Sequence, residues 1–511
     1  MTEPVTFGPC PLSIEQVVAL AQRQAPGRLA ADAAWRERID AGARFLDSLL
    51  DKEGVIYGVT TGYGDSCVVA VPLEHVEALP RHLFTFHGCG LGQALDPAAT
   101  RAVLAARLQS LCYGMSGVRL VLLERLQAFL DHDVLPVIPQ EGSVGASGDL
   151  TPLSYVAATL SGERDVLYQG VRRGAADLHR ELGWTPLVLR PKEALALMNG
   201  TAVMTGLACL AFSRAEYLLR LATRITALNV VALQGNPEHF DERLFAAKPH
   251  PGQMQVAAWL RQDLAITAPA APLHRLQDRY SLRCAPHVLG VLADSLGWLR
   301  GFIETELNSA NDNPIIDGDN ERVLHGGHFY GGHIAFAMDS LKTLVANVAD
   351  LLDRQLALLV DVRYNHGLPS NLSGAPADRA MLNHGFKAVQ IGASAWTAEA
   401  LKHTMPASVF SRSTECHNQD KVSMGTIAAR DALRVLELTE QVAAATLLAA
   451  NQGVWLRNQA PDARPLPPVL SAMHEQLLGD FAPVLEDRAL EGELRHCLTR
   501  IAEQHWELHH A

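Results

Sequence analysis

Hydrophobic positions recur at helical spacing along most of the second half of the chain. Apolar residues return every three or four positions in long stretches, a pattern that predicts helices rather than strands. The stretches cover residues 193–232, 284–310, 334–362, 386–403 and 424–451. Long helices bury their apolar faces against one another, so we expect a mainly α fold with a central helical bundle.

The first half of the chain alternates helical stretches with loops rich in glycine. Residues 54–64 contain four glycines in eleven positions, which is the composition of a loop. Residues 98–131 have helical spacing and predict a helix that ends before a second glycine-rich stretch, residues 142–148. Residues 163–190 predict a small strand or hairpin insertion.

These patterns also predict where the segments of the fold begin and end. With 511 residues, the chain is long enough for several domains or one very large helical core. A proline-rich connector over residues 460–470 precedes the last helices. We predict an N-terminal domain over residues 1–200 that carries the second glycine-rich loop, a helical bundle over 201–465, and C-terminal helices over 466–511.

The composition favours helices packing on helices and argues against a nucleic acid partner. Apolar residues make up 48% of the chain and charged residues 19%, a balance that suits a large buried core and argues against disorder. The formal net charge is -12, and no run of Lys and Arg is long enough to follow a phosphate backbone. We therefore expect no binding to nucleic acid.

Several other signals favour a cytoplasmic protein without bound metal or nucleotide. The first residues have neither the basic nor the apolar region of a secretory signal. Apolar stretches at 203–212 and 286–299 are broken by Arg214 and Asp294, which argues against a membrane protein. The eight cysteines stand without a CxxC pair, so neither a disulfide framework nor a zinc site is expected. The absence of GxGxxG and P-loop motifs gives no reason to expect a nucleotide.

The second glycine-rich stretch has the composition for covalent chemistry of the backbone itself. An amide nitrogen can attack the carbonyl carbon two residues back only where both residues are small and the loop is tightly bent. Gly148 would supply the nitrogen, Ala146 the carbonyl carbon and Ser147 the hydroxyl that leaves as water. The product is a methylidene-imidazolone, an electron-poor alkene. Taken alone, these residues are also consistent with an ordinary flexible turn.

Longer motifs connect this loop to a known family. The string GSVGASGDLTPL at residues 142–153 resembles the signature of the histidine, phenylalanine and tyrosine ammonia-lyases, whose members build this ring. Four further motifs resemble those of the family in the same order. They are YGVTTGYG at 57–64, with Tyr63 in place of the usual Phe, NGT at 199–201, QDRYSLR at 277–283 and NDNP at 311–314.

The resemblance implies a fold, a cofactor and a reaction. The fold would be fumarase/ammonia-lyase-like, with an N-terminal cofactor-bearing domain joined to a long central helical bundle. The cofactor would be 4-methylidene-imidazol-5-one, formed autocatalytically from Ala146, Ser147 and Gly148. The reaction would be elimination of ammonia from an aromatic amino acid, the small-molecule partner. Chains would assemble as a homotetramer whose active sites mix residues from three chains.

Roles for individual residues follow from this resemblance and from the needs of the reaction. Tyr57 is a candidate general base, provided that nearby positive charge and hydrogen bonds lower the pKa of its phenol. Arg283 offers a planar fork that fits the substrate carboxylate. Tyr280 lies on the same face if the segment is helical, and could hydrogen-bond the ring or the developing charge.

The remaining candidates would bind the substrate or support the cofactor. By resemblance, Asn199, Gln277 and Asn311 belong to the substrate-binding and cofactor-supporting shell. Phe329 matches an aromatic residue that packs near the cofactor. The plainer interpretations are a core Phe for Phe329, a packing Tyr beside a turn for Tyr57, and a solvated or salt-bridged surface residue for Arg283.

Three features bear on the substrate. Where histidine-specific members carry a carboxylate, this chain has Gln419, with Glu415 before it, as in the phenylalanine and tyrosine lyases and related aminomutases. Lys387 likewise resembles the phenylalanine and tyrosine branch. Phe86 and His87 match the pair that lines the pocket for the substrate ring. His87 could pair with a phenol hydroxyl, which favours tyrosine over phenylalanine and keeps histidine as an alternative.

We therefore predict a carbon-nitrogen lyase most like tyrosine ammonia-lyase, converting L-tyrosine to trans-p-coumarate. Histidine ammonia-lyase, phenylalanine ammonia-lyase and an aromatic 2,3-aminomutase remain alternatives, as does a non-catalytic structural homologue. A hydrolase using Ser147 is disfavoured because the loop is not GxSxG.

A metal site is the last alternative, and solvent-facing histidines are the simpler interpretation. The histidines that could form one are His325, His328 and His333, or His505, His509 and His510.

Overall fold

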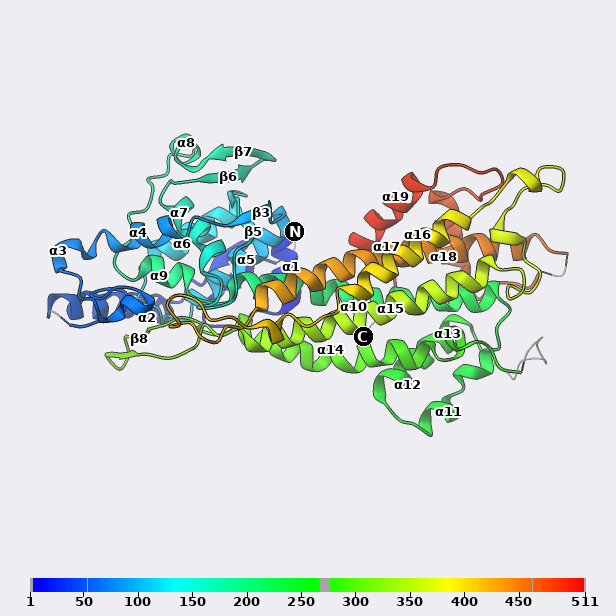
Figure 1. Cartoon of the computed structure of the whole chain (residues 1–511), viewed down its shortest axis with the longest axis horizontal. Helices are drawn as coiled ribbons and strands as arrows, with labels where there is room; N and C mark the ends of the chain where they lie inside the picture. The colour runs from blue at the N-terminus through cyan, green and yellow to red at the C-terminus, as the bar shows by residue number, and fades with distance from the viewer. Residues whose placement is uncertain (1–2, 53, 267–275, 462, 510–511) are drawn as a thin grey trace. The chain divides into compact units, whose positions relative to one another are not determined.

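The computed structural model describes residues 3–52, 54–266, 276–461 and 463–509, and it is mainly helical, as predicted (Figure 1). The chain forms two compact units, each built from segments that are distant in sequence. Unit 1 comprises Met1–Ser213, Leu299–Asp339 and Pro406–Arg430, and unit 2 comprises Arg214–Trp298, Ser340–Met405 and Asp431–Ala511. The three-part division at residues 200 and 465 stays a prediction.

The described residues of unit 1 combine helices with four small sheets. Its helices are α1 (Ile14–Ala21), α2 (Ala33–Asp51), α3 (Leu73–Val76), α4 (Leu79–Phe86), α5 (Pro97–Leu111), α6 (Leu120–Asp131), α7 (Leu150–Leu160), α8 (Ala175–Glu181) and α9 (Glu193–Met198). Its strands are β1 (Val5–Phe7), β2 (Gly27–Leu29), β3 (Leu91–Ala94), β4 (Leu135–Pro136), β5 (Pro139–Glu141), β6 (Asp165–Tyr168), β7 (Val171–Gly174), β8 (Ile315–Asp317) and β9 (Arg322–Leu324).

The strands of unit 1 pair mostly in antiparallel fashion. β1 pairs with β2 in parallel, whereas β3–β5, β4–β6–β7 and β8–β9 are antiparallel. In the hairpin β6–β7, Val166 is the partner of Arg173. This hairpin confirms the insertion predicted over residues 163–190.

Unit 2 contains the short helices α11 (Glu242–Ala246), α12 (Pro251–Asp263) and α13 (Tyr280–Arg283), together with α16 (Lys387–Lys402), α18 (Pro468–Asp480) and α19 (Glu491–Ala502). Four long helices contribute residues to both units. They are α10 (Ala202–Ala232), α14 (Ala285–Leu307), α15 (Gly332–Val360) and α17 (Gly425–Asn458) (Figure 1). They confirm the helices predicted over 284–310, 334–362 and 424–451, whereas the stretch predicted over 193–232 is divided into α9 and α10 because the backbone leaves the helical conformation at Asn199 and Gly200.

Buried polar side chains join the long helices within unit 2. The Asn229 side-chain amide of α10 donates to Gln355 Oε1 of α15 at 2.7 Å. The Arg457 Nε of α17 donates to the Ala232 carbonyl of α10 at 2.8 Å. Because buried polar groups need partners, these bonds fix which helix faces meet.

The helix predicted over residues 98–131 is in fact two helices, α5 and α6. The backbone between them turns at Gly114 and Gly117, whose φ angles of +70° and +63° fall in the left-handed region that favours glycine. The hydrophobic spacing on both sides masks this break. α5 begins as its sequence dictates, with Asp96 accepting a hydrogen bond from the Ala99 amide at 2.9 Å and Pro97 at the first helical position.

One helix among the described residues, α10, is long and apolar enough to cross a membrane by length and composition. The sequence predicts that Arg214 breaks the apolar stretch at 203–212, but the apolar helix continues past it. Of the most apolar window in α10, 78% is buried within the protein. Such burial is typical of a helix in a protein core.

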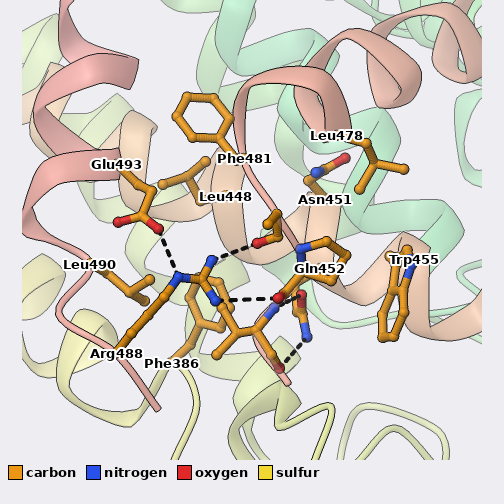
Figure 2. A pocket seen from close by; sticks show the side chains of 13 residues that line it. Phe386, Leu448, Asn451, Gln452, Trp455, Leu478, Phe481, Arg488, Leu490 and Glu493 are labelled. Carbon is orange, nitrogen blue, oxygen red and sulfur yellow. Dashed lines mark hydrogen bonds and ion pairs between the residues drawn. The ribbon is translucent and has the colours of Figure 1, made fainter. Parts of the chain in front are cut away.

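A small cavity in unit 2 lies where the loop before α19 meets α17 (Figure 2). It measures about 20 Å³, room for roughly one water molecule. Arg488 lies across it and donates to Glu493 Oε1 at 2.8 Å and to the Ala482 carbonyl at 2.6 Å. Phe386, which precedes the predicted site residue Lys387, is part of its wall. The size and these internal contacts indicate a structural void.

Candidate active site

The loop predicted to carry the chemistry lies between β5 and α7 in unit 1. Its backbone is tightly bent, with φ angles of +68° at Gly145 and +75° at Gly148. Two hydrogen bonds join it to Gly200: the Gly200 amide donates to the Ser147 carbonyl at 3.1 Å, and the Asp149 amide donates to the Gly200 carbonyl at 2.8 Å. The residues on both sides of Gly148 are therefore tied to Gly200.

Gly148 has no room for a side chain. A Cβ atom at this position would lie 2.8 Å from Gly200 Cα and closer still to the Gly200 carbonyl. Ala146 and Gly148, the two residues whose backbone atoms would have to meet, are both small. The loop thus has the bend and the small residues that formation of a methylidene-imidazolone from Ala146, Ser147 and Gly148 requires.

Asp149 anchors the end of this loop. Its carboxylate is fully buried and accepts hydrogen bonds from the Val203 and Met204 amides, both at 3.0 Å, at the start of α10. The hydroxyl groups of Ser143 (3.1 Å) and Thr426 also donate to it. Burial raises the pKa of Asp149, and these hydrogen bonds oppose that rise. A carboxylate at a helix N-terminus is favourably placed with respect to the helix dipole.

The predicted residues Asn199 and Asn311 lie next to Gly200. Asn199 is buried, and its side-chain amide donates to Asp312 Oδ1 at 3.0 Å. Asn311 is also buried, and its Oδ1 accepts from Ser110 Oγ at 3.0 Å. Both asparagines are therefore neighbours of Gly200, to which the loop is hydrogen-bonded.

Tyr57 and Glu415 lie together in unit 1. The Tyr57 hydroxyl oxygen accepts a hydrogen bond from the Gly64 amide at 2.8 Å, and Glu415 Oε1 accepts from the Asp65 amide at 2.8 Å. Burial raises the pKa of Tyr57, the Gly64 bond lowers it, and the Glu415 carboxylate raises it further, with a net rise. The lowered pKa expected of a general base is therefore not produced by these neighbours in a single chain.

Gln419 and Glu415 belong to one strained turn. Thr414 and Gln419 exchange backbone hydrogen bonds of 2.9 and 3.2 Å, and the Thr414 hydroxyl donates to Gln419 Oε1 at 2.8 Å. Between them, Glu415, Cys416 and His417 have φ angles of +51°, +55° and +66°. Left-handed conformations are unfavourable for such residues, so this turn is maintained by its surroundings.

Phe86 and His87 lie at the end of α4, with ring centroids 4.5 Å apart. The Phe86 side chain is 58% exposed. Burial, together with the nearby Arg164 guanidinium, lowers the pKa of His87 to about 4. His87 is therefore neutral near pH 7 and can either donate or accept a hydrogen bond.

The candidates Gln277, Tyr280, Arg283 and Lys387 lie in unit 2. Gln277 and Lys387 are exposed, and Tyr280 is 72% exposed. Tyr280 and Arg283 form the single turn α13, where the Arg283 guanidinium carbon lies 4.7 Å from the centre of the Tyr280 ring. The Arg283 Nε donates to the Asp278 carbonyl at 2.9 Å. The expectation that Tyr280 and Arg283 share a helical face is confirmed.

Phe329 is half-buried in the turn that precedes α15 in unit 1. His325, His328 and His333, from the same segment, are exposed. Across the described parts of the chain, no group of three or more His, Cys, Asp and Glu side chains is placed to hold a metal ion. His510, from the second set of histidines, lies outside the described residues.

Sequence reasoning missed Asp149 and Arg107. Arg107 is fully buried in α5, and its Nη1 donates to the Asn199 carbonyl at 2.9 Å. The available signals were the place of Asp149 inside the loop motif and the presence of a charged Arg107 in the apolar face of a buried helix.

The fold corresponds to that of the ammonia-lyase structures. The structure of tyrosine aminomutase from Streptomyces globisporus superposes with a TM-score of 0.90 at 34% sequence identity, covering 98% of this chain and 97% of that one.

Sequence comparison defines the family. The model for aromatic amino acid lyases matches residues 12–479. The histidine ammonia-lyase of Bacillus velezensis is 36% identical over 469 residues, which cover 91% of this chain and 90% of the relative. The histidine ammonia-lyase of Chloroflexus aurantiacus is 40% identical over 459 residues, covering 88% and 86%. The chain belongs to the aromatic amino acid lyase family. It is an enzyme of the ammonia-lyase class, EC 4.3.1.

Proposed function

We propose that this chain eliminates ammonia from an aromatic L-amino acid by means of a methylidene-imidazolone that it forms from Ala146, Ser147 and Gly148. The observation that carries the proposal is the tight bend at Gly148, whose neighbours on both sides are tied to Gly200. Once formed, the ring supplies an electrophile that activates the amino group for departure.

The side chains of this enzyme perform the remaining tasks. Arg283 binds the substrate carboxylate through its planar fork, and Tyr280 lies beside it. Tyr57 removes the proton from the β-carbon of the substrate. Burial and the Glu415 carboxylate raise the pKa of Tyr57 within one chain. In the working enzyme, a cation from another chain must therefore lower that pKa. Arg283 of a neighbouring chain is the candidate.

We propose that the working enzyme is a homotetramer with shared active sites. In one chain, Phe86 and Tyr280 have exposed rings. Apolar side chains are also exposed along helices: Val291 of α14 is 50% exposed and Ile391 of α16 is 62% exposed. Exposed apolar surface of this kind supports association between copies.

Two substrates compete for this site. The relatives named histidine ammonia-lyase support histidine better than the tyrosine that the sequence motifs favour. The neutral Gln419 and the exposed Lys387 are the features of this chain that support tyrosine. His87, which is uncharged near pH 7, suits either an imidazole or a phenol. Histidine is therefore the first substrate to test, and tyrosine the second.

Separate incubations with histidine, tyrosine and phenylalanine test the proposal, with ultraviolet absorbance and chromatography of the products. Urocanate from histidine or p-coumarate from tyrosine identifies the substrate and supports the proposal. A β-amino acid product identifies a 2,3-aminomutase instead, in which ammonia adds back to the β-carbon. No deamination of any of the three, by protein that contains the ring, contradicts the proposed substrate class.

A further inference from the structure

Charged side chains are buried around the residues that anchor the loop. Lys192 and Asp312 form an ion pair, Nζ to Oδ2, of 2.5 Å, and both side chains are fully buried. Arg107 is fully buried as well, and its Nη2 donates to Ser110 Oγ at 3.0 Å. Burying such charges is costly, and apolar residues of similar size would pack at lower cost. Their presence therefore calls for a function other than packing.

These charges hold Asn199 from two directions. Arg107 Nη1 donates to the Asn199 backbone carbonyl at 2.9 Å. The Asn199 side-chain amide donates to Asp312 Oδ1 at 3.0 Å, while the other Asp312 oxygen contacts Lys192. The backbone and the side chain of Asn199 are therefore both held in place. Asn199 directly precedes Gly200, the residue to which the loop is hydrogen-bonded.

Arg107 also packs directly against Gly200. Gly200 has a φ of +146°, and a Cβ there would meet the Arg107 guanidinium and lie 2.6 Å from the Asn311 carbonyl oxygen. The guanidinium thus blocks movement of Gly200 away from the loop. Gly200 in turn contacts Ser147 and Asp149 through the two backbone hydrogen bonds described above.

The charge on Arg107 is balanced by neighbouring carboxylates. Burial lowers the pKa of Arg107 to about 10, and Asp312 and Asp149 oppose that effect. Arg107 is therefore still a cation at neutral pH. Its Nε is buried without a hydrogen-bond partner in the described structure. In the described structure its orientation is held by the hydrogen bonds to Asn199 and Ser110 and by packing against Gly200, so the side chain acts mainly on the Asn199–Gly200 backbone.

We propose that Arg107, supported by the Lys192–Asp312 ion pair, is a positioning residue for formation of the ring. It keeps Gly200 against Ser147 and Asp149, which holds the Gly148 nitrogen close to the Ala146 carbonyl carbon. This inference rests on the proposed function, because it concerns how that function's cofactor is made.

The ring-forming step balances without an oxidant or a further reactant. A bond forms between the Gly148 nitrogen and the Ala146 carbonyl carbon. The Ala146 oxygen leaves as water with the hydrogens of the Gly148 and Ser147 nitrogens. Ser147 then loses its hydroxyl and its α-hydrogen as a second water. Because this step requires close approach of two backbone atoms, small displacements of Gly200 slow it strongly.

The test compares Arg107→Lys with Arg101→Lys. Lysine keeps a cation at position 107 but lacks the fork that reaches both Asn199 and Ser110. Arg101 lies on the same helix, pairs with Asp133 at 2.7 Å and donates to the Ala21 carbonyl at 2.8 Å. Intact mass, sampled at intervals after synthesis, gives the fraction of chains that are lighter by two waters. Circular dichroism and the thermal midpoint report folding.

We expect Arg107→Lys to form the ring about tenfold or more slowly than the wild type, and Arg101→Lys to form it at the wild-type rate. A folded Arg107→Lys protein that forms the ring as fast as the wild type overturns the inference.

A milder variant covers the case in which Arg107→Lys does not fold. Ser110→Ala removes one acceptor of Arg107, together with the hydrogen bonds that the hydroxyl donates to Ser309 and Asn311, and leaves every buried charge in place. It should slow ring formation severalfold, and ring formation at the wild-type rate in Ser110→Ala then overturns the inference. If the wild-type chain itself never loses two waters, the proposed function fails, which is a different result from a fully formed ring in these variants.

Discussion

The Gly200 amide donates a hydrogen bond to the Ser147 carbonyl at 3.1 Å. Gly200 lies in the short break between α9 and α10, whereas Ser147 lies in the loop before α7. The hydrogen bond therefore connects two of the motifs that the sequence presents far apart, GASGD and NGT. Their proximity gives the loop a defined bend, which a flexible turn would lack.

Gly148→Ala should abolish ring formation while leaving most of the fold intact. The added Cβ would collide with the Gly200 backbone, and the φ of +75° would be strained as well. Gly170→Ala is the matched control, because Gly170 has a φ of +77° but open space around the site of a Cβ. Both variants should lose about 1–2 kcal/mol to backbone strain, and Gly148→Ala should lose more because of the collision. Intact mass should show the ring in Gly170→Ala and not in Gly148→Ala.

The pH dependence of turnover should show the effect of Glu415 on the pKa of Tyr57. A general base acts when deprotonated, so activity rises with pH towards the pKa of Tyr57. Glu415 raises that pKa, and Glu415→Gln should therefore shift the rising limb of kcat/KM to lower pH. The exposed Glu503→Gln serves as the control. A shift to higher pH, or none, would contradict the assignment of Tyr57 as the base.

His87 should determine the preference of the enzyme for substrates with polar rings. Replacing it by leucine leaves a buried phenol or imidazole without its partner, at a cost of about 1–3 kcal/mol. His87→Leu should therefore raise the preference for phenylalanine over tyrosine or histidine by about 10- to 100-fold in kcat/KM. Unchanged ratios of kcat/KM among the three substrates would show that His87 does not contact the substrate ring.

Acid should destabilise the protein through His179. This side chain is fully buried, neither ring nitrogen has a hydrogen-bond partner in the described structure, and burial lowers its pKa to about 4 from 6.5. The unfolded chain binds a proton that the folded chain does not, so stability falls as pH drops from 6.5 towards 4.

His179→Leu should reduce the loss of thermal midpoint between pH 7 and pH 5. The exposed His132 belongs to the same aromatic cluster around Trp184, so His132→Leu is the control and should leave the loss unchanged. An equal loss in wild type and His179→Leu would show that other groups carry the acid sensitivity.

The sequence predicted the long helices and the loop because both depend on local signals. Helical spacing and glycine content are readable within a window of residues, and α14, α15 and α17 follow them closely. The break between α5 and α6 was missed because left-handed glycines at 114 and 117 interrupt a periodicity that continues on both sides.

Contacts between distant segments could not be predicted in this way. The role of Arg107 depends on its meeting Asn199, which is 92 residues away in the sequence. The environment of Tyr57 depends on its burial, which raises the pKa of its phenol, and on Glu415, whose carboxylate raises that pKa further. Motifs identified both residues of that pair, but only the fold gives the sign of their interaction.

The most direct test of the account is the intact mass of the purified chain beside that of Ser147→Ala, with deamination of histidine and tyrosine measured on the same samples. We predict a wild-type chain lighter than its sequence by two waters and active, and a folded Ser147→Ala chain of full mass and almost no activity. A wild-type chain of full mass that still releases ammonia would contradict the self-made cofactor.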